Sequence, residues 1–146
     1  MKSNIMFVDD SISVLKSLKW LFMDEPYRIF LFDSPLEALS TIDFKQFSVV
    51  VSDQSMPEMT GIQFLEKIKQ KSPDTVGIIM CAFIESETAL NAIKRGVVNR
   101  FIEKSLDINE IKQAVAMALA QSEINVENRK NGMLTFQPGI VFSFPQ

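Results

Sequence analysis

Residues 49–57 read VVVSDQSMP, a β-branched run that leads to a single carboxylate, Asp53, just before a turn. A short, continuous apolar run bounded by a turn is typical of a strand that is buried on both faces. Such strands belong to parallel sheets whose two faces are covered by helices, and ligands bind outside the carboxyl ends of these strands. Asp53 is therefore predicted to lie at a functional edge of a sheet.

The segments on both sides of this strand alternate between short apolar runs and helical patterns. Further strands are predicted at residues 5–8, 28–32, 76–81 and 100–103. Apolar residues at helical spacing, preceded by capping residues, predict a helix after each strand. These helices are expected to begin near residues 11, 34, 60, 86 and 107.

Five strands that alternate with five helices imply parallel strands joined by right-handed crossovers. The predicted fold is an α/β, doubly wound (βα)5 sandwich around a five-stranded parallel sheet, with the flavodoxin-like strand order 2-1-3-4-5. The periodic pattern decays after about residue 122. We expect residues 123–146 to be a C-terminal tail or the start of a linker, partly helical, with no output domain.

The composition excludes several functional classes. The chain of 146 residues has a net charge of −3, which gives no electrostatic reason to expect direct binding to nucleic acid. It contains no histidine, so the commonest general base and most transition-metal sites are absent. A single cysteine, with neither a signal peptide nor a membrane-spanning run, predicts a cytoplasmic protein that does not bind membranes.

Three acidic residues stand at the carboxyl ends of predicted strands. Asp9 and Asp10 follow the first strand, and Asp53 ends the third. If these strands are neighbours, the like charges converge and repel one another unless a cation neutralises them. Oxygen-only ligands suit Mg²⁺, with Mn²⁺ as an alternative. Lys104, after the fifth strand, places a positive charge at the same edge.

Each of these residues also has an ordinary structural explanation. An Asp pair after a strand is often a helix N-cap, a lone Asp before a turn often forms an Asx-turn, and a lysine at a strand end is usually solvated. Taken singly, these explanations are favoured. Taken together, at the ends of strands one, three and five, the residues are hard to ascribe to capping.

The chain resembles the receiver domain of bacterial two-component response regulators, the CheY-like superfamily, over residues 4–121. The resemblance rests on FVDD at 7–10, VVVSDQSMPEMTG at 49–61 and RFIEK at 100–104. It implies a receiver domain over residues 1–122. It also implies a signalling domain that is not an enzyme, apart from catalysing its own phosphorylation and dephosphorylation.

Particular roles follow from the resemblance. Asp53 would be the phosphoacceptor, and Asp9 and Asp10 would hold Mg²⁺ together with Asp53 and the backbone carbonyl of Ser55. Lys104 would contact the phosphoryl group. The implied partners are a sensor histidine kinase or phosphotransfer protein as donor and an output protein or domain as receiver of the signal. A second copy of the chain is a further candidate partner.

The sequence departs from the family pattern at two positions. Cys81 stands where the family has a Thr or Ser switch residue, and a thiol donates a weaker hydrogen bond than a hydroxyl. The aromatic switch position is Phe101, without a tyrosine hydroxyl. Ser105 replaces the proline after the lysine, so a trans peptide bond and a shifted Lys104 are expected there.

Two alternatives stay open. One is a pseudo-receiver, a protein-interaction module with weak or no phospho-switching, which Cys81 and Ser105 favour and the complete acid set opposes. The other is the N-terminal receiver fragment of a larger regulator, for which an HD-type cyclic-di-GMP phosphodiesterase is one candidate.

Overall fold

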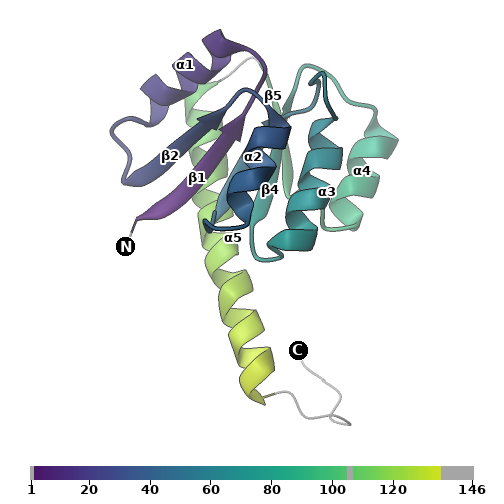
Figure 1. Cartoon of the computed structure of the whole chain (residues 1–146). Coiled ribbons are helices and arrows are strands. Elements are labelled where there is room, and N and C mark those ends of the chain that lie inside the picture. The colour runs from purple at the N-terminus through teal and green to yellow at the C-terminus, as the bar shows by residue number, and fades with distance from the viewer. Residues whose placement is uncertain (1, 105–106, 136–146) are drawn as a thin grey trace.

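The computed structural model describes residues 2–104 and 107–135 as a five-stranded sheet with helices on both faces (Figure 1). The strands are β1 (Ser3–Val8), β2 (Tyr27–Phe32), β3 (Val49–Asp53), β4 (Val76–Cys81) and β5 (Arg100–Glu103). The helices are α1 (Ile12–Phe22), α2 (Pro35–Ile42), α3 (Gly61–Lys71), α4 (Ser86–Lys94) and α5 (Ile108–Thr135).

The sheet is parallel throughout, and its strand order is β2-β1-β3-β4-β5. This confirms the predicted fold class and strand order. The central strands β3 and β4 are buried along their whole length, as their uninterrupted apolar sequences predict. All five strands therefore end at one edge of the sheet, where Asp53 is the last residue of β3.

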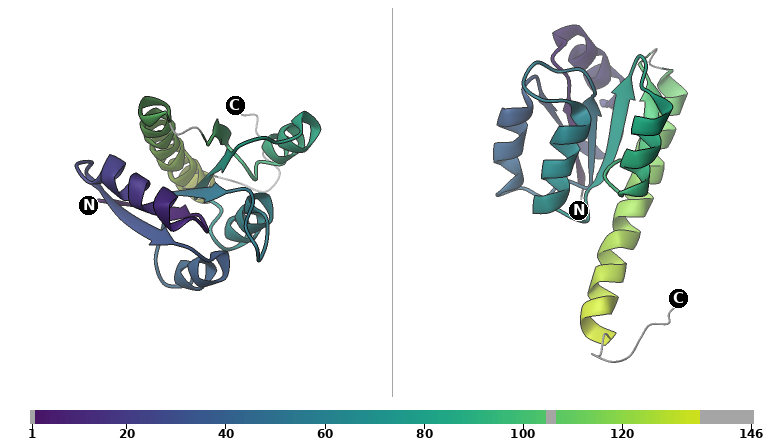
Figure 2. Two further views of the ribbon diagram at one scale, coloured as in Figure 1. Left: turned by 90° about the horizontal axis from the view of Figure 1, so that it is seen from above. Right: turned by 90° about the vertical axis from the view of Figure 1, so that its right-hand side faces the viewer.

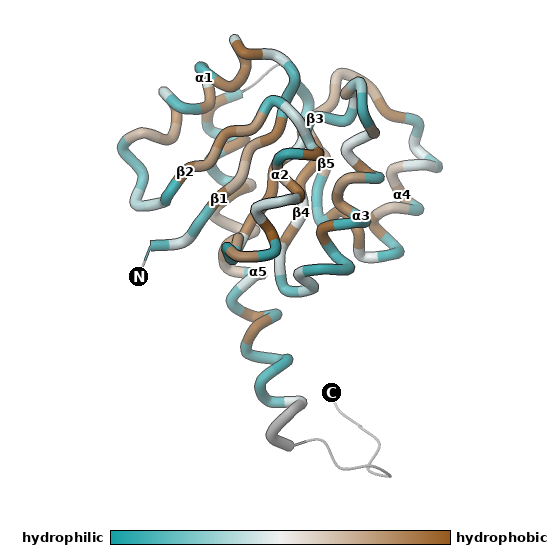
Figure 3. Tube along the Cα trace, in the orientation of Figure 1, coloured by the Kyte–Doolittle hydropathy of each residue, from teal (hydrophilic) through white to brown (hydrophobic). Residues whose placement is uncertain are grey.

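Two hydrophobic clusters lie on opposite faces of the sheet. Helices α1 and α5 cover one face, and α2, α3 and α4 cover the other (Figure 2). Hydrophobic residues accordingly follow the strands and the inner faces of the helices, while the outer faces are hydrophilic (Figure 3). The largest fully buried side chains are Phe7, Phe22, Phe64, Ile5, Met6, Leu18, Leu65, Ile68, Ile78, Ile79, Met80 and Ile102.

Side-chain caps are present at the helices that flank the functional edge. Ser11 and Ser34 accept hydrogen bonds from backbone N–H groups of α1 and α2. Thr60 and Gln63 form a complete capping box at α3. Gly96 ends the α4 region with a φ of 73°, the left-handed conformation that glycine adopts without steric cost.

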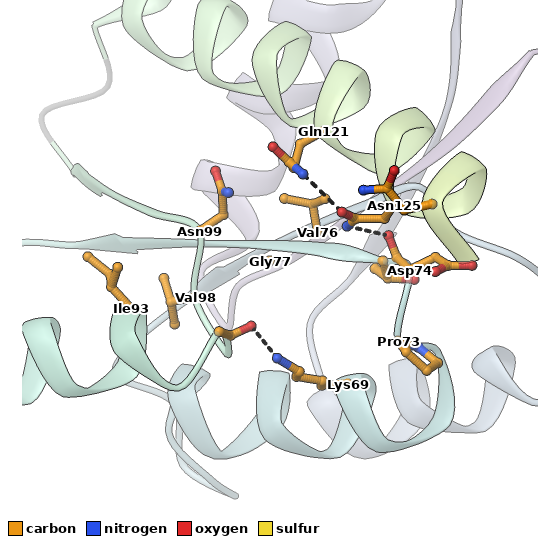
Figure 4. Close-up of a pocket in the computed structure, with 13 residues that line it drawn as sticks. Lys69, Pro73, Asp74, Val76, Gly77, Ile93, Val98, Asn99, Gln121 and Asn125 are labelled. Carbon is orange, nitrogen blue, oxygen red and sulfur yellow. Dashed lines mark hydrogen bonds between the residues drawn. The ribbon is translucent and has the colours of Figure 1, made fainter. Parts of the chain in front are cut away.

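Helix α5 runs without a break through residue 122, where the apolar pattern decays, and continues to Thr135. Its far half projects beyond the sheet and is largely hydrophilic (Figures 1 and 3). Asp74, in the loop before β4, anchors this half: its carboxylate pairs with Arg129 at 2.7 Å, and its carbonyl accepts a hydrogen bond from Asn125. Figure 4 shows Asn125 and Gln121 reaching toward this loop.

A pocket of about 470 Å³ lies between α5 and the α3 and α4 side of the molecule, and Figure 4 shows residues that line it. It lies beside Val76 and Gly77, at the start of β4, and therefore at the opposite end of the strand from Asp53. Carboxamide side chains of Gln121 and Asn125 form part of its wall. None of the predicted site residues lines it.

Within the described residues, no helical stretch combines the length and the hydrophobicity needed to cross a bilayer.

Candidate functional site

The predicted acidic residues converge at the carboxyl edge of the sheet. Asp9, Asp10 and Asp53 each present a carboxylate oxygen, and these atoms lie within 4.8 Å of one another. Asp9 is fully buried and Asp53 is 4% exposed, whereas Asp10 is exposed. The cause is the pairing of β1 with β3: Val8 stands beside Ser52, so the next residue of each strand carries a carboxylate to the same place.

Lys104 adds a positive charge to the acidic cluster. Its Nζ lies 3.0 Å from Asp9 Oδ2 and 3.1 Å from Asp53 Oδ2. The lysine backbone is held by a 2.9 Å hydrogen bond from its N–H to the Cys81 carbonyl. Lys104 thus lies within reach of both buried acids. Ser105, for which a trans peptide bond is predicted, lies outside the described residues.

Backbone N–H groups hold the other oxygen of each buried acid. Asp9 Oδ1 accepts a hydrogen bond from the Ser11 N–H at 2.8 Å, and Asp53 Oδ1 accepts one from the Ser55 N–H at 3.4 Å. Each acid therefore begins an Asx-type turn, the ordinary structural role that the sequence allowed. The same turns fix the direction of both carboxylates, so the structural role supports a functional one.

The electrostatics of the cluster are unbalanced toward negative charge. Burial raises the pKa of Asp53; the hydrogen bond from Lys104 opposes this rise, and the charge of Asp9 adds to it. For Lys104, burial lowers the pKa, but its close pairing with the Asp9 and Asp53 carboxylates and the attraction of their negative charges outweigh this effect, so the pKa is raised overall. Lys104 is therefore protonated at neutral pH.

The residues present suit a hard divalent cation. Three carboxylates offer only oxygen ligands, which Mg²⁺ prefers. Among residues 2–104 and 107–135, no donor makes a well-directed hydrogen bond to the buried Asp9 Oδ2, although the Lys104 ammonium lies 3.0 Å away. Among these residues, Asp9 Oδ2 is paired with one ammonium only, and a carboxylate oxygen has a second lone pair that can bind a metal ion.

Cys81 and Phe101 occupy the positions that the resemblance assigns to the switch residues. Cys81 is the last residue of β4 and is buried, with 8% of its surface exposed. Burial, with added repulsion from Asp53 and Glu103, raises the pKa of its thiol, so it is protonated and unreactive at neutral pH. Phe101 in β5 is partly buried against the cluster on the α3 and α4 face.

Gln54 holds the loop beside Asp53, a role that the sequence analysis did not predict. Its side-chain Oε1 accepts a hydrogen bond from the Ile62 N–H at 3.0 Å, and its backbone carbonyl accepts one from the Gly61 N–H at 2.9 Å. The loop between Asp53 and α3 is therefore closed on itself. No local pattern indicates such a contact, because the two partners are eight residues apart.

Comparison with known proteins identifies the family of the chain. The family model for the response regulator receiver domain matches residues 5–116. The transcriptional regulatory protein ZraR of Klebsiella oxytoca is 36% identical over 100 residues, which cover 68% of this chain and 23% of ZraR. The chain thus spans about a quarter of the length of this curated relative.

Two solved structures share the fold over most of the chain. The crystal structure of an adenylate cyclase from Rhodopirellula baltica matches with a TM-score of 0.82 and 28% sequence identity. The match covers 94% of this chain and 100% of the chain in that structure. The signal receiver domain of an HD domain-containing protein from Pseudomonas fluorescens has a TM-score of 0.78 and 25% identity, with coverage of 84% and 98%.

Proposed function

The chain belongs to the family of response regulator receiver domains, and from this premise we propose that it accepts a phosphoryl group on the Asp53 carboxylate in a Mg²⁺-dependent reaction. One observation carries the proposal: the buried carboxylates of Asp9 and Asp53 converge with the Lys104 ammonium at one strand edge. A structural ion pair would need only one acid. The second buried acid and the nearby Asp10 are explained by a metal-assisted acceptor site.

In the proposed reaction, an Asp53 oxygen attacks the phosphorus of a phosphohistidine or of a small donor such as acetyl phosphate. A new P–O bond forms as the bond to the leaving imidazole nitrogen or acetate oxygen breaks, and the imidazole recovers a proton from water. Lys104 lies where it can contact a phosphoryl oxygen and offset developing negative charge. Hydrolysis of the resulting acyl phosphate restores the Asp53 carboxylate.

Asp9, Asp10, Asp53 and the Ser55 carbonyl would hold the Mg²⁺ ion, with Mn²⁺ as an alternative. When bound, the ion supplies positive charge that neutralises the phosphoryl oxygens and orients the donor. Asp9 is suited to this role because it is buried and its direction is fixed by the Ser11 N–H. Asp10 is exposed and so can bind the ion directly or through water.

The phosphodonor is a sensor histidine kinase or a phosphotransfer protein, and an output protein or domain receives the signal. The small share of ZraR that the chain covers supports its being the receiver of a larger regulator. Its likeness to the receiver of an HD domain-containing protein is consistent with an HD-type phosphodiesterase output. The switch from one state to the other would involve Cys81 and Phe101.

Incubation with acetyl phosphate and Mg²⁺, followed by mass spectrometry of the intact protein, tests the proposal. We expect the mass to increase by one phosphoryl group in the wild type and to stay unchanged in Asp53→Asn. Beryllofluoride with Mg²⁺ should shift backbone amide resonances around the acidic cluster. A wild-type protein that shows neither response and has no affinity for Mg²⁺ would instead be a pseudo-receiver.

A further inference from the structure

We propose that Gln54 is a positioning residue, which holds the loop at residues 54–60 in the shape that binds Mg²⁺. The inference rests on the proposed function, because it concerns the metal affinity of the same site. Gln54 directly follows Asp53 and directly precedes Ser55, whose backbone carbonyl is a proposed metal ligand. Its own side chain points away from this role, since its Oε1 accepts from the backbone of α3.

Three hydrogen bonds hold Gln54, one to β4 and two from the first turn of α3. Its N–H donates to the Met80 carbonyl of β4 at 3.0 Å, so the sheet pairing continues one residue beyond Asp53. Its carbonyl accepts from Gly61 at 2.9 Å, and its side chain accepts from Ile62 at 3.0 Å. The two acceptor bonds satisfy N–H groups of the first turn of α3, which have no partner within the helix.

The residues after Gln54 depend on this anchor. Ser55 is exposed, and its N–H makes only a long hydrogen bond of 3.4 Å to Asp53. A loop that is not held in place must lose conformational freedom when its carbonyl binds an ion, and this loss weakens the affinity. The Gln54 side chain therefore orders the loop before the ion binds, because it connects the start of the loop to α3 by a hydrogen bond.

Gln63 provides a matched control, because its side chain also caps the N-terminus of α3. It is also a glutamine whose Oε1 caps the N-terminus of α3, where it accepts from the Thr60 N–H at 2.9 Å. Unlike the half-buried Gln54, Gln63 is exposed and lies within α3, and its hydrogen bond is at the far end of the loop from Ser55. Loss of either side chain removes one helix-capping bond, but only loss of Gln54 releases the part of the loop beside Asp53.

The test compares the Mg²⁺ affinity of Gln54→Leu and Gln63→Leu by isothermal titration calorimetry on the full chain. We expect Gln54→Leu to weaken Mg²⁺ binding about tenfold, the usual scale for a residue that orients a metal ligand. Gln63→Leu should keep the wild-type affinity while losing similar thermal stability. Equal Mg²⁺ affinities in the two variants would show that Gln54 is only a helix cap and would overturn the inference.

Amide hydrogen exchange without metal gives a second measurement. Gln54→Leu should speed exchange at Ile62, and Gln54→Glu should restore protection, because a carboxylate also accepts from that N–H group. Unchanged exchange at Ile62 in Gln54→Leu would contradict the inference even if Mg²⁺ binding changed. A wild type that does not bind Mg²⁺ would refute the proposed function itself, and the exchange experiment distinguishes the two failures.

Discussion

Substitution of Gly61 by alanine is a direct test of how tightly the candidate site is packed. Gly61 is the first residue of α3, and a Cβ there would overlap the backbone carbonyl oxygen of Asp53. It would also lie 2.7 Å from Ile79 Cδ1 and 3.1 Å from the Asp53 carbonyl carbon. Two of these three atoms are backbone, so the clash cannot be relieved by a rotamer change alone.

The expected loss of stability in Gly61→Ala is the balance of two opposing effects. Overpacking a tight site costs about 1–3 kcal/mol, and the upper end applies because Asp53 backbone would have to move. Alanine gains about 1 kcal/mol over glycine in a helix, so the free energy of unfolding of Gly61→Ala should fall by about 2 kcal/mol. For a chain of this size, this corresponds to a midpoint about 1 M lower in urea.

Gly132→Ala is the matched control, because a Cβ at Gly132 meets no atom within 4 Å. It should be neutral or stabilising by at most about 0.5 kcal/mol in the same urea titration, followed by circular dichroism. Because Asp53 would be displaced, Gly61→Ala should also lose part of its Mg²⁺ affinity, whereas Gly132→Ala should not. A Gly61→Ala protein as stable as Gly132→Ala would refute the packing argument.

Three further substitutions test the charges and the switch. Asp53→Asn should be more stable than the wild type at neutral pH, on the order of 1 kcal/mol. Because the pKa of Asp53 is raised in the folded state, the folded protein keeps its proton at pH values where the unfolded chain has released it, and the stability of the wild type falls as the pH rises through this range. The stability advantage of Asp53→Asn should therefore vanish in acid. Urea titrations at several pH values measure this. Lys104→Met should lower the free energy of unfolding by about 2 kcal/mol at neutral pH, less than the loss of a fully buried pair, because a quarter of the lysine side chain is exposed. Equal unfolding midpoints of wild type and variant would show that the ion pairs of Lys104 with Asp9 and Asp53 contribute nothing to stability. Cys81→Thr should enlarge the amide shifts caused by beryllofluoride more than it changes the rate of phosphorylation by acetyl phosphate, because a hydroxyl donates a stronger hydrogen bond than a thiol; equal changes in both would contradict this.

The strands and the acidic edge could be predicted because their signals are local. Each strand is a short apolar run, and the caps at Ser11, Ser34 and Thr60 stand next to the helices they begin. Once the strand order is fixed, the parallel register alone brings Asp9 beside Asp53. The geometry of the acidic cluster therefore follows from two local patterns and one topological rule.

Other features depend on contacts that a one-dimensional pattern does not contain. The far half of α5 is polar on most sides, and its helical pattern fades for that reason. It is held by Asp74, which lies 51 residues before Asn125 and 55 before Arg129. Gln54 was missed for a similar reason, because its side chain caps a helix from the opposite side of a loop.

Helix α5 has the form of a long rod attached to the sheet at one end. Its 28 residues make a rod about 42 Å long at 1.5 Å per residue. Its first half packs on the same sheet whose edge carries Asp53, and the rod runs on past the ion pair of Arg129 with Asp74. If phosphorylation tilts the packed half by about 5°, a rigid rod of that length moves at its far end by about 3–4 Å. A small structural change at the acidic cluster would then move the far end of α5 by a distance comparable to the width of a side chain.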